Sequence, residues 1–592
     1  MTVLLFLAVL FQANQAPSEE LLGLMLKAQY ALVSGDHEQA LAYAERAVAM
    51  DPQNADAAYL QVEILLELQG NSGFPQSLKA AAPLQRQKDL VAGLHELATK
   101  FKEDYRFAKA LGTLLVSNPR LAGLGEHSAP EDYLNQAVIL LESQAEPDID
   151  ELSDTYYYLG RWYLVSEMYF EASAAFGRVC ELDQESSWAL YYAAQTSEAS
   201  HQLRSAQNYY LRFQGIEEED FWRGKPPVDL DIATITAQLQ PTREHIENLR
   251  DLLRDKDDLA AYYRVAARFA KAAQYELCMT VLESVPTEKR EVTYYGLFLK
   301  ASMELHRYGE TLASVLRALE GKPDMQTRGL LVDYGVESAM LLGDFDRVRS
   351  LARTYSQTPG LTLKLDLFDA FAAVLGQQDP SRWRHVLNKH GNSDFIRLLT
   401  PQVEEMGLKI VALKNLTQLF MGRQDWNGAL HGLQDLGPLE MLPDAVQEDL
   451  AVIYVLGGNP EEGFRLYADL LRKLPDRADL MNNFGYFLAD SGNRLEEAKR
   501  LIETALSQDS QNSAYLDSMG WVLYHLGEFA EAERFLRLAL ESDGEDPEKL
   551  EHLGDVLSAM DRLPEARREW SRAMERASDA YFRILDKLDP ER

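Results

Sequence analysis

The residue types that could support catalysis do not occur here at the spacings that catalysis needs. His95 and Glu96 begin like the zinc-protease motif HExxH, but Thr99 stands where the second histidine would be. Gly70-Asn71-Ser72-Gly73 is glycine-rich, yet no Lys-Ser/Thr pair follows it to complete a phosphate-binding loop. No G-x-S-x-G elbow occurs, and the 11 histidines are scattered without ligand spacing. The sequence therefore predicts no catalytic residue, no metal, no cofactor and no small-molecule substrate.

Cysteine chemistry is limited to two residues, Cys180 and Cys278. They could form at most one disulfide, and they are too few for a cysteine-rich metal site. Both fall where a helical packing pattern, described below, has room for a small side group. We therefore expect both to be buried core residues.

The charge of the protein narrows the choice of partner. Asp and Glu total 93 against 59 Lys and Arg, which gives a formal net charge of −34 over 592 residues. These acids are spread along the sequence rather than gathered in a tail. Such a surface repels phosphate backbones and anionic lipid, so it argues against nucleic acid and against membrane docking. A protein or peptide partner fits this charge better.

Small residues recur with a period of about 34 in the last third of the sequence. Gly485, Gly520 and Gly554 are 35 and 34 residues apart. About twelve positions after each small residue of this register comes another small one: Ala429, Gly463, Ala498, Ala532 and Ala566. Seven positions further on come Leu436, Leu470, Ala505, Ala539 and Ala573. Such a period predicts pairs of antiparallel helices that touch where side chains are small.

Turn and stop signals mark the ends of these helices. Gly527-Glu528-Phe529 and Gly343-Asp344-Phe345 each combine a glycine suited to a left-handed helix end with an acidic residue suited to the next N-terminus. Pro52 and Pro475 are predicted to end second helices, because proline cannot continue a helix.

These motifs identify the repeat. The runs Leu159-Gly160…Tyr163…Ala172…Phe176 and Gly520…Gly527…Ala532…Ala539 resemble the tetratricopeptide-repeat (TPR) family. The resemblance covers most of residues 20–580 and implies an all-α solenoid of helical hairpins. We expect roughly a dozen repeats in two or three blocks.

Breaks in the period predict the block boundaries. Ala194 to Ala266 is 72 residues where two repeats would be 68, and the Pro226-Pro227 stretch falls in that gap. A second slip lies between Val336 and Thr417. The predicted organisation is a signal-like segment at 1–16, an N-terminal block at 17–215 with an irregular insert near 70–83, a non-repeat connection at 216–257, a divergent block at 258–400, a regular C-terminal block at 401–580 and a tail at 581–592.

The first helix of each repeat is expected to line a concave face, on which positions 2, 5, 9 and 12 point inward. Aromatic side chains at such positions offer a large contact area with little loss of entropy. The candidate partner-binding residues are Tyr157, Arg161, Tyr191, Tyr263, Asn482, Tyr486, Trp521 and Tyr524, together with Phe221 and Trp222 of the connection. Packing within the solenoid is the alternative role for each of them.

The same register places acids in the C-terminal groove, at Asp517, Glu551 and Asp555. They would repel the acidic heat-shock-protein tails that some TPR co-chaperones grip, by about 1 kcal/mol per exposed pair. Neutral or basic segments are the expected guests.

The first residues favour export. Residues 2–11, TVLLFLAVLF, have the length of a signal-peptide core and are too short to span a bilayer, and a small-residue cleavage site could lie at 13–16. Against this reading, no basic residue precedes Lys27 and Pro17 would follow the cut. The alternative is an apolar first helix that caps the solenoid.

The last 120 residues suggest a context for the scaffold. Phe484–Asp490 and Leu516–Tyr524 resemble long Gram-negative cell-envelope TPR adaptors, which include the lipoprotein partner of a carboxyl-terminal processing protease. That resemblance implies an adaptor that presents substrates to a protease. The sequence departs from it, because no lipid-accepting cysteine lies near the first residues. The alternatives are a cytoplasmic assembly or regulatory scaffold and, third, an enzyme with an unrecognised site.

Overall fold

The structure is a computed structural model that describes residues 18–70, 83–122, 129–216, 226–256, 258–377, 379–434, 442–492 and 494–576, together with Ile584 and Lys587. Throughout these residues the regular secondary structure is helical. The predicted all-α helical-hairpin solenoid is therefore confirmed. The protein divides into two compact units, residues 1–226 and 227–592.

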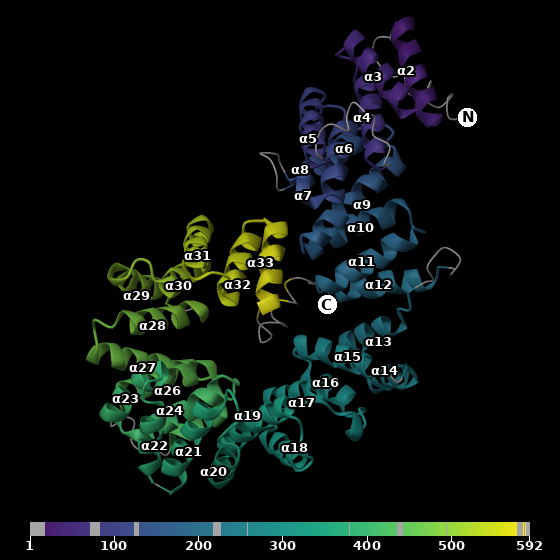
Figure 1. Ribbon diagram of the computed structural model, residues 1–592. Helices are drawn as coiled ribbons and strands as arrows, with labels where there is room; N and C mark the ends of the chain where they lie inside the picture. The colour runs from purple at the N-terminus through teal and green to yellow at the C-terminus, as the bar shows by residue number, and fades with distance from the viewer. Residues whose placement is uncertain are drawn as a thin grey trace. The chain divides into compact units, whose positions relative to one another are not determined.

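The first unit is a succession of helical hairpins (Figure 1). Its helices are α2 (Glu19–Val33), α3 (His37–Met50), α4 (Ala55–Gly70), α5 (Pro83–Lys100), α6 (Tyr105–Ser117), α7 (Pro119–Ala122), α8 (Pro130–Glu142), α9 (Ile149–Val165), α10 (Tyr169–Leu182), α11 (Ser187–Ala199) and α12 (Leu203–Gln214).

The second unit continues the same pattern with one interruption. Its helices are α13 (Asp229–Leu239), α14 (Arg243–Lys256), α15 (Leu259–Lys271), α16 (Tyr275–Leu282), the 3₁₀ turn η2 (Thr287–Lys289), α17 (Val292–Glu304), α18 (Tyr308–Glu320), α19 (Met325–Leu341), α20 (Phe345–Thr354), α21 (Thr362–Gln377), α22 (Ser381–His390), α23 (Asp394–Met406), α24 (Leu408–Met421), α25 (Trp426–Gln434), α26 (Asp444–Leu456), α27 (Pro460–Lys473), α28 (Ala478–Asp490), α29 (Leu495–Gln508), α30 (Ser513–His525), α31 (Phe529–Asp543), α32 (Pro547–Ala559) and α33 (Leu563–Arg576).

The repeating glycines lie at equivalent crossings of the two helices of a hairpin. A Cβ added at Gly520 of α30 would lie 2.5 Å from Leu536 Cγ of α31, and one at Gly485 of α28 would lie 2.7 Å from Ile502 Cγ1 of α29. Gly554 of α32 faces Trp570 of α33 in the same way. The predicted register is confirmed, because bulk at these positions would push the helices apart.

The predicted turns are also confirmed. Gly527 and Gly343 have φ values of +80° and +69°, a conformation that costs glycine little. Beyond Gly343, the Asp344 carboxylate accepts a hydrogen bond from Arg347 N at 3.1 Å and so caps α20. The helices α3 and α27 end at Met50 and Lys473, just before the two prolines.

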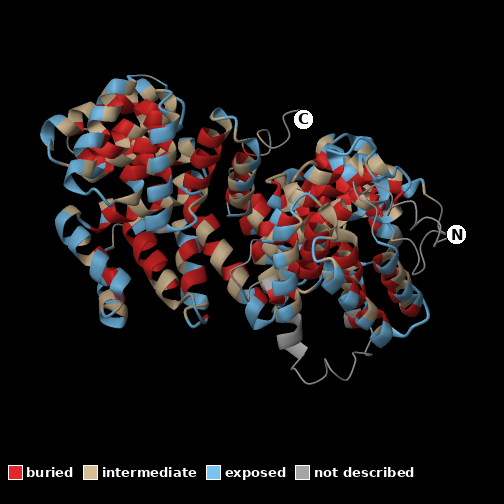
Figure 2. Cartoon of the chain, turned by 90° about the horizontal axis from the view of Figure 1, so that it is seen from above, coloured by how far each residue is buried: buried red, intermediate tan, exposed pale blue. Residues whose placement is uncertain are grey.

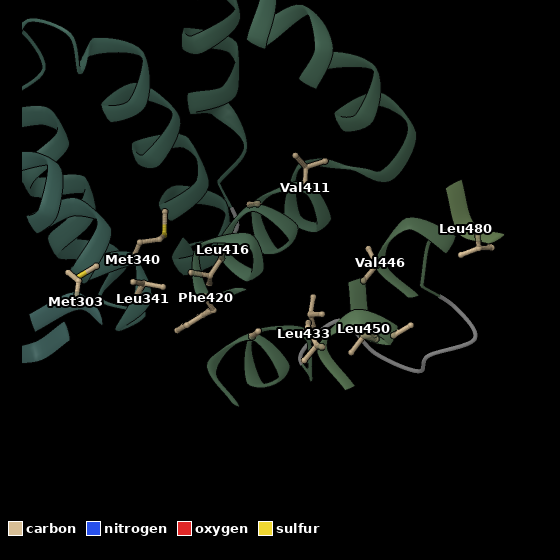
Figure 3. Close-up of a cluster of buried hydrophobic side chains, with 14 of the residues drawn as sticks. Met303, Met340, Leu341, Val411, Leu416, Phe420, Leu433, Val446, Leu450 and Leu480 are labelled. Carbon is tan, nitrogen blue, oxygen red and sulfur yellow. The ribbon is translucent and has the colours of Figure 1, made fainter. Parts of the chain in front are cut away.

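Buried side chains lie along the faces that neighbouring helices share, and exposed residues lie outward (Figure 2). In the middle of the second unit, Met303, Met340 and Phe420 pack together, and the same cluster continues through Leu433, Leu450 and Leu480 (Figure 3). Cys180 and Cys278 are buried and unpaired, and burial raises the pKa of each thiol to about 12. They are core residues, as expected.

The structure differs from the predicted connection at 216–257, because α13 and α14 form a further hairpin there. Leu249 and Leu253 of α14 are buried with Ala261 of α15 in one apolar cluster. Between residues 226 and 256, only 226–228 and 240–242 lie outside helices. A four-residue change in the repeat period indicates a longer connection between two hairpins. It does not exclude helices on either side of that connection.

The second predicted slip corresponds to one extra helix, α23, between the α21–α22 and α24–α25 hairpins. The helices α22 and α23 lie between α21 and α24 in the sequence, yet α21 packs directly on α24. Arg423, just after α24, then reaches back to Glu304 of α17 and Glu337 of α19, at 2.6 and 2.8 Å. These ion pairs hold the start of the regular C-terminal block against hairpins more than 80 residues earlier.

In the described part of the protein, no helix has the length and apolar character that crossing a membrane requires. No His, Cys, Asp and Glu side chains there gather into a group that could hold a metal ion. The apolar segment predicted at 1–16, the insert at 71–82, and Phe221 and Trp222 lie outside the described residues.

Candidate protein-binding surface

Three consecutive first helices, α28, α30 and α32, bring most of the predicted C-terminal residues together. The 34–35-residue period repeats the same helix face in each hairpin, and α30 packs on both of the other helices. The surface that they form is called the C-terminal stripe here; it consists of Asn482, Tyr486, Asp490, Trp521, Tyr524, His525 and His552.

Trp521 is the centre of the C-terminal stripe. Its ring stacks on His552 with centroids 4.1 Å apart and on Tyr524 at 5.0 Å, and His525 meets it edge-on at 4.7 Å. Its Nε1 donates to Asp490 Oδ1 at 3.3 Å. Trp521 is 9% exposed, whereas Tyr524 is half-buried. Trp521 therefore supports the surface, and Tyr524 offers more of its area to a partner.

A buried ion pair fixes His552 beneath the tryptophan. His552 Nδ1 lies 3.0 Å from Asp517 Oδ1, and both side chains are less than 10% exposed. Burial alone would lower the pKa of His552, but the charge and hydrogen bond of Asp517 outweigh it, with help from Glu548 and Asp555. The pKa of His552 is raised as a result.

Polar groups of the C-terminal stripe are only partly satisfied. The Tyr486 hydroxyl donates to Glu548, and burial together with that carboxylate raises the pKa of Tyr486. Within the described residues, Asn482 Oδ1 and His525 Nε2 are buried without a hydrogen-bond partner. Burial lowers the pKa of His525. An unpaired buried polar atom costs about 1–3 kcal/mol, so these two atoms reduce the stability of this part of the fold.

The acids predicted for this groove are largely neutralised from within. Asp517 pairs with His552, and Lys587 Nζ lies 2.8 Å from Glu551 Oε1 and 2.6 Å from Asp555 Oδ1. Glu551 is 3% exposed. A lysine of the same protein thus already pairs with these two acids.

In the first unit, Tyr157 and Arg161 of α9 lie next to one another, with the guanidinium 5.7 Å from the ring centroid. Trp188 of α11 meets Tyr157 edge-on at 4.5 Å and is 39% exposed. Tyr191, further along α11, is half-buried, and its hydroxyl accepts from Gln195 Nε2 at 2.9 Å. The aromatic pairing thus joins two consecutive first helices.

Tyr263 of α15 belongs to neither group. It is 9% exposed, and its hydroxyl donates to the Lys289 carbonyl at 3.4 Å. The structure therefore gives Tyr263 an internal contact, at the turn between α16 and α17.

The residues predicted from the sequence do not include Trp188, Asp490, His525 or His552. Trp188 occupies position 2 of the repeat that begins at Ser187, so the same register could have found it. No spacing signal marks His552, because its role depends on contacts made across α30 and α32.

Solved structures with similar folds have low similarity to this protein. One subunit of the APC/C hetero-tetramer Cut9–Hcn1 is 12% identical, and the match covers 95% of each protein with a TM-score of 0.28. Pseudomonas aeruginosa pilF is 20% identical over 30% of this protein and 82% of its own length, with a TM-score of 0.24. MamA AMB-1 is 19% identical over 28% of this protein and 96% of its own length, with a TM-score of 0.22.

Sequence comparison gives two shorter matches. The TPR repeat-containing protein PA4667 of Pseudomonas aeruginosa is 37% identical over 89 residues, which are 14% of this protein and 15% of that one. The match thus spans less than a sixth of the relative. The tetratricopeptide-repeat family model matches residues 23–54, which form most of the α2–α3 hairpin. The repeat match and the succession of helical hairpins together support a tetratricopeptide-repeat protein, of the kind that serves as a scaffold for protein–protein interaction.

Proposed function

We propose that this protein is a non-catalytic scaffold that binds a segment of a partner protein along the C-terminal stripe. The observation that carries the proposal is the aromatic cluster that consecutive first helices share. Trp521 forms a rigid base, and the half-buried Tyr524 stacks on it with ring centroids 5.0 Å apart and offers contact area to a partner. Aromatic anchors of this kind are typical of protein-binding hot spots.

We further propose that the scaffold works in a bacterial cell envelope and presents substrates to a protease. The support is the resemblance of Phe484–Asp490 and Leu516–Tyr524 to envelope adaptors, together with the apolar run at 2–11. The alternative is a cytoplasmic assembly scaffold. N-terminal sequencing of the protein from fractionated cells separates them, because an intact Met1 in the cytosol contradicts export.

Affinity capture with a paired variant tests the binding surface. The variant combines Trp521→Phe with Tyr524→Ala, which removes contact area but keeps an aromatic ring against His552. Phenylalanine is chosen because Trp521→Ala would leave a cavity and cost about 3–5 kcal/mol of folding stability. We expect capture of the partner to fall by about tenfold or more, since hot-spot residues contribute about 2 kcal/mol or more.

The matched control is Tyr30→Ala, because Tyr30 of α2 is 77% exposed and outside the C-terminal stripe. It should capture the partner as well as the unchanged protein does. Equal capture by the paired variant, with an unchanged circular dichroism spectrum, would remove the C-terminal stripe as the binding surface.

A further inference from the structure

A cavity of about 360 Å³ opens between α16, the η2 turn, α17 and α18 in the second unit. It is separate from the C-terminal stripe, both in sequence and in its lining residues. It is lined by Glu283 just after α16, by Thr287 of η2, and by residues of α17 and α18. These helices lie in the teal region of Figure 1.

The floor of the cavity is aromatic and rigid. Tyr294 and Phe298, one turn apart on α17, stack with centroids 5.5 Å apart and planes 9° apart, and they are 3% and 7% exposed. Tyr295 meets Tyr294 edge-on at 5.2 Å and is half-buried. These fixed rings form an apolar surface that an apolar or aromatic group can cover.

Two arginines line the same cavity, and each makes a contact with a neighbouring residue. The Arg290 guanidinium lies 4.6 Å from the centre of the Tyr294 ring, and its Nε donates to the Val285 carbonyl at 3.2 Å. Arg317 Nη2 donates to Ser314 Oγ at 3.4 Å. Each guanidinium keeps further N–H donors, because arginine carries five.

Neither arginine has a carboxylate within 4 Å among the described residues, although acids outnumber bases by 93 to 59 in the whole sequence. The two acids of the lining are engaged elsewhere: Glu283 with Arg250 at 3.8 Å and Glu310 with Arg307 at 3.6 Å. The cavity thus presents two positive groups beside an aromatic floor.

We propose that this cavity binds a peptide carboxylate that is flanked by an apolar side group. The carboxylate would accept hydrogen bonds from Arg290 and Arg317, a geometry that guanidinium groups favour, and the apolar group would lie on Phe298 and Tyr295. The C-terminus of a peptide and an acidic side group both supply this chemistry. This cavity is a second binding site, separate from the C-terminal stripe. Each of the two sites can therefore be tested, and rejected, independently of the other.

Fluorescence anisotropy with labelled octapeptides tests the proposal on the full-length protein. One pair of peptides ends in Leu or Phe with a free carboxylate, a second pair has the same sequences amidated, and a third is amidated with an internal Glu beside the Leu or Phe. The free-acid peptides should bind about tenfold more tightly than the amides, the value of one charge-assisted pair. If the amidated peptides with an internal Glu bind as tightly as the free-acid peptides, the cavity accepts a glutamate side-chain carboxylate as well as a C-terminal one.

Arg317→Gln and Arg290→Gln should each weaken the binding of the free-acid peptides by about tenfold. Arg317 is exposed, so its substitution should leave the fold intact even if loss of Arg290 disturbs Tyr294. Arg328→Gln, at an exposed arginine on α19, is the matched control and should change nothing. Any of three results would overturn the proposal. The free-acid and amidated peptides could bind equally well, or Arg317→Gln could leave the affinity unchanged. The third is that no carboxylate peptide binds at about 1 mM, a concentration that corresponds to a binding free energy of about 4 kcal/mol.

Discussion

Two histidines of the C-terminal stripe have opposite environments at nearly the same place. His552 of α32 is held against Asp517, so its protonated form is favoured in the folded protein. His525 of α30 is half-buried, and its buried Nε2 has no hydrogen-bond partner among the described residues, so its neutral form is favoured. The local chemistry therefore makes the stability of this surface depend on pH in two opposing ways.

The sign of each effect follows from linkage. Because the pKa of His552 is raised, its pair with Asp517 stabilises fully below the unfolded pKa of about 6.5, and that contribution is lost as pH rises through the folded pKa. The difference in Tm between the unchanged protein and His552→Gln should shrink as pH rises from about 6 to about 9.

The opposite holds for His525→Gln. Because the pKa of His525 is lowered, the unchanged protein should lose stability relative to this variant as pH falls below about 6.5. Parallel Tm profiles for all three proteins would contradict both assignments.

At the scale of helices, the hairpins depend on close contact at the repeating glycines. Gly520→Leu should destabilise the C-terminal block by about 1–3 kcal/mol, because even a Cβ would meet Leu536 at 2.5 Å. Gly309→Ala in α18 is the control, since a Cβ there meets nothing within 4 Å. Chemical denaturation followed by circular dichroism measures both changes. If Gly520→Leu unfolded at the same denaturant concentration as the unchanged protein, the helix register would be wrong.

The hairpins could be predicted because their period, their glycine turns and their proline stops are local signals. Other turns lacked such a signal: Glu167, His201 and Ala273 adopt positive φ values of 59°, 62° and 52° although they are not glycine. The α13–α14 hairpin and the packing of α21 on α24 likewise depend on tertiary contacts, which a break in period does not specify.

The candidate site was predictable only in part, for the same reason. Register placed Tyr486, Trp521 and Tyr524 on one face, and the structure brings them together. It could not indicate that Trp521 would stack on His552, or that Lys587 would reach Glu551. Those contacts join helices through residues whose types carry no repeat signal.

At the scale of the whole molecule, each unit has a core of its own. Buried clusters between Leu21 and Ala175 belong to the first unit, and clusters between Leu230 and Ile584 belong to the second. Solenoids gain stability from contacts between neighbouring repeats, so a break between units need not unfold either part.

Fragments 1–226 and 227–592 should therefore each be helical and unfold cooperatively when expressed alone. Circular dichroism during heating measures both properties. A fragment without helical signal, or one that folds only when the other is added, would show that the two units depend on each other.

Site-specific photo-crosslinking at position 524 tests most directly whether the C-terminal stripe contacts a partner protein. A benzophenone amino acid replaces Tyr524 in one variant and Leu538 in the other; Leu538 lies on α31 and is 38% exposed. Both variants are irradiated in the cells that make the protein. We predict a discrete protein adduct at position 524 that is missing at position 538. Identical adducts at both positions, or none at 524, would contradict the account.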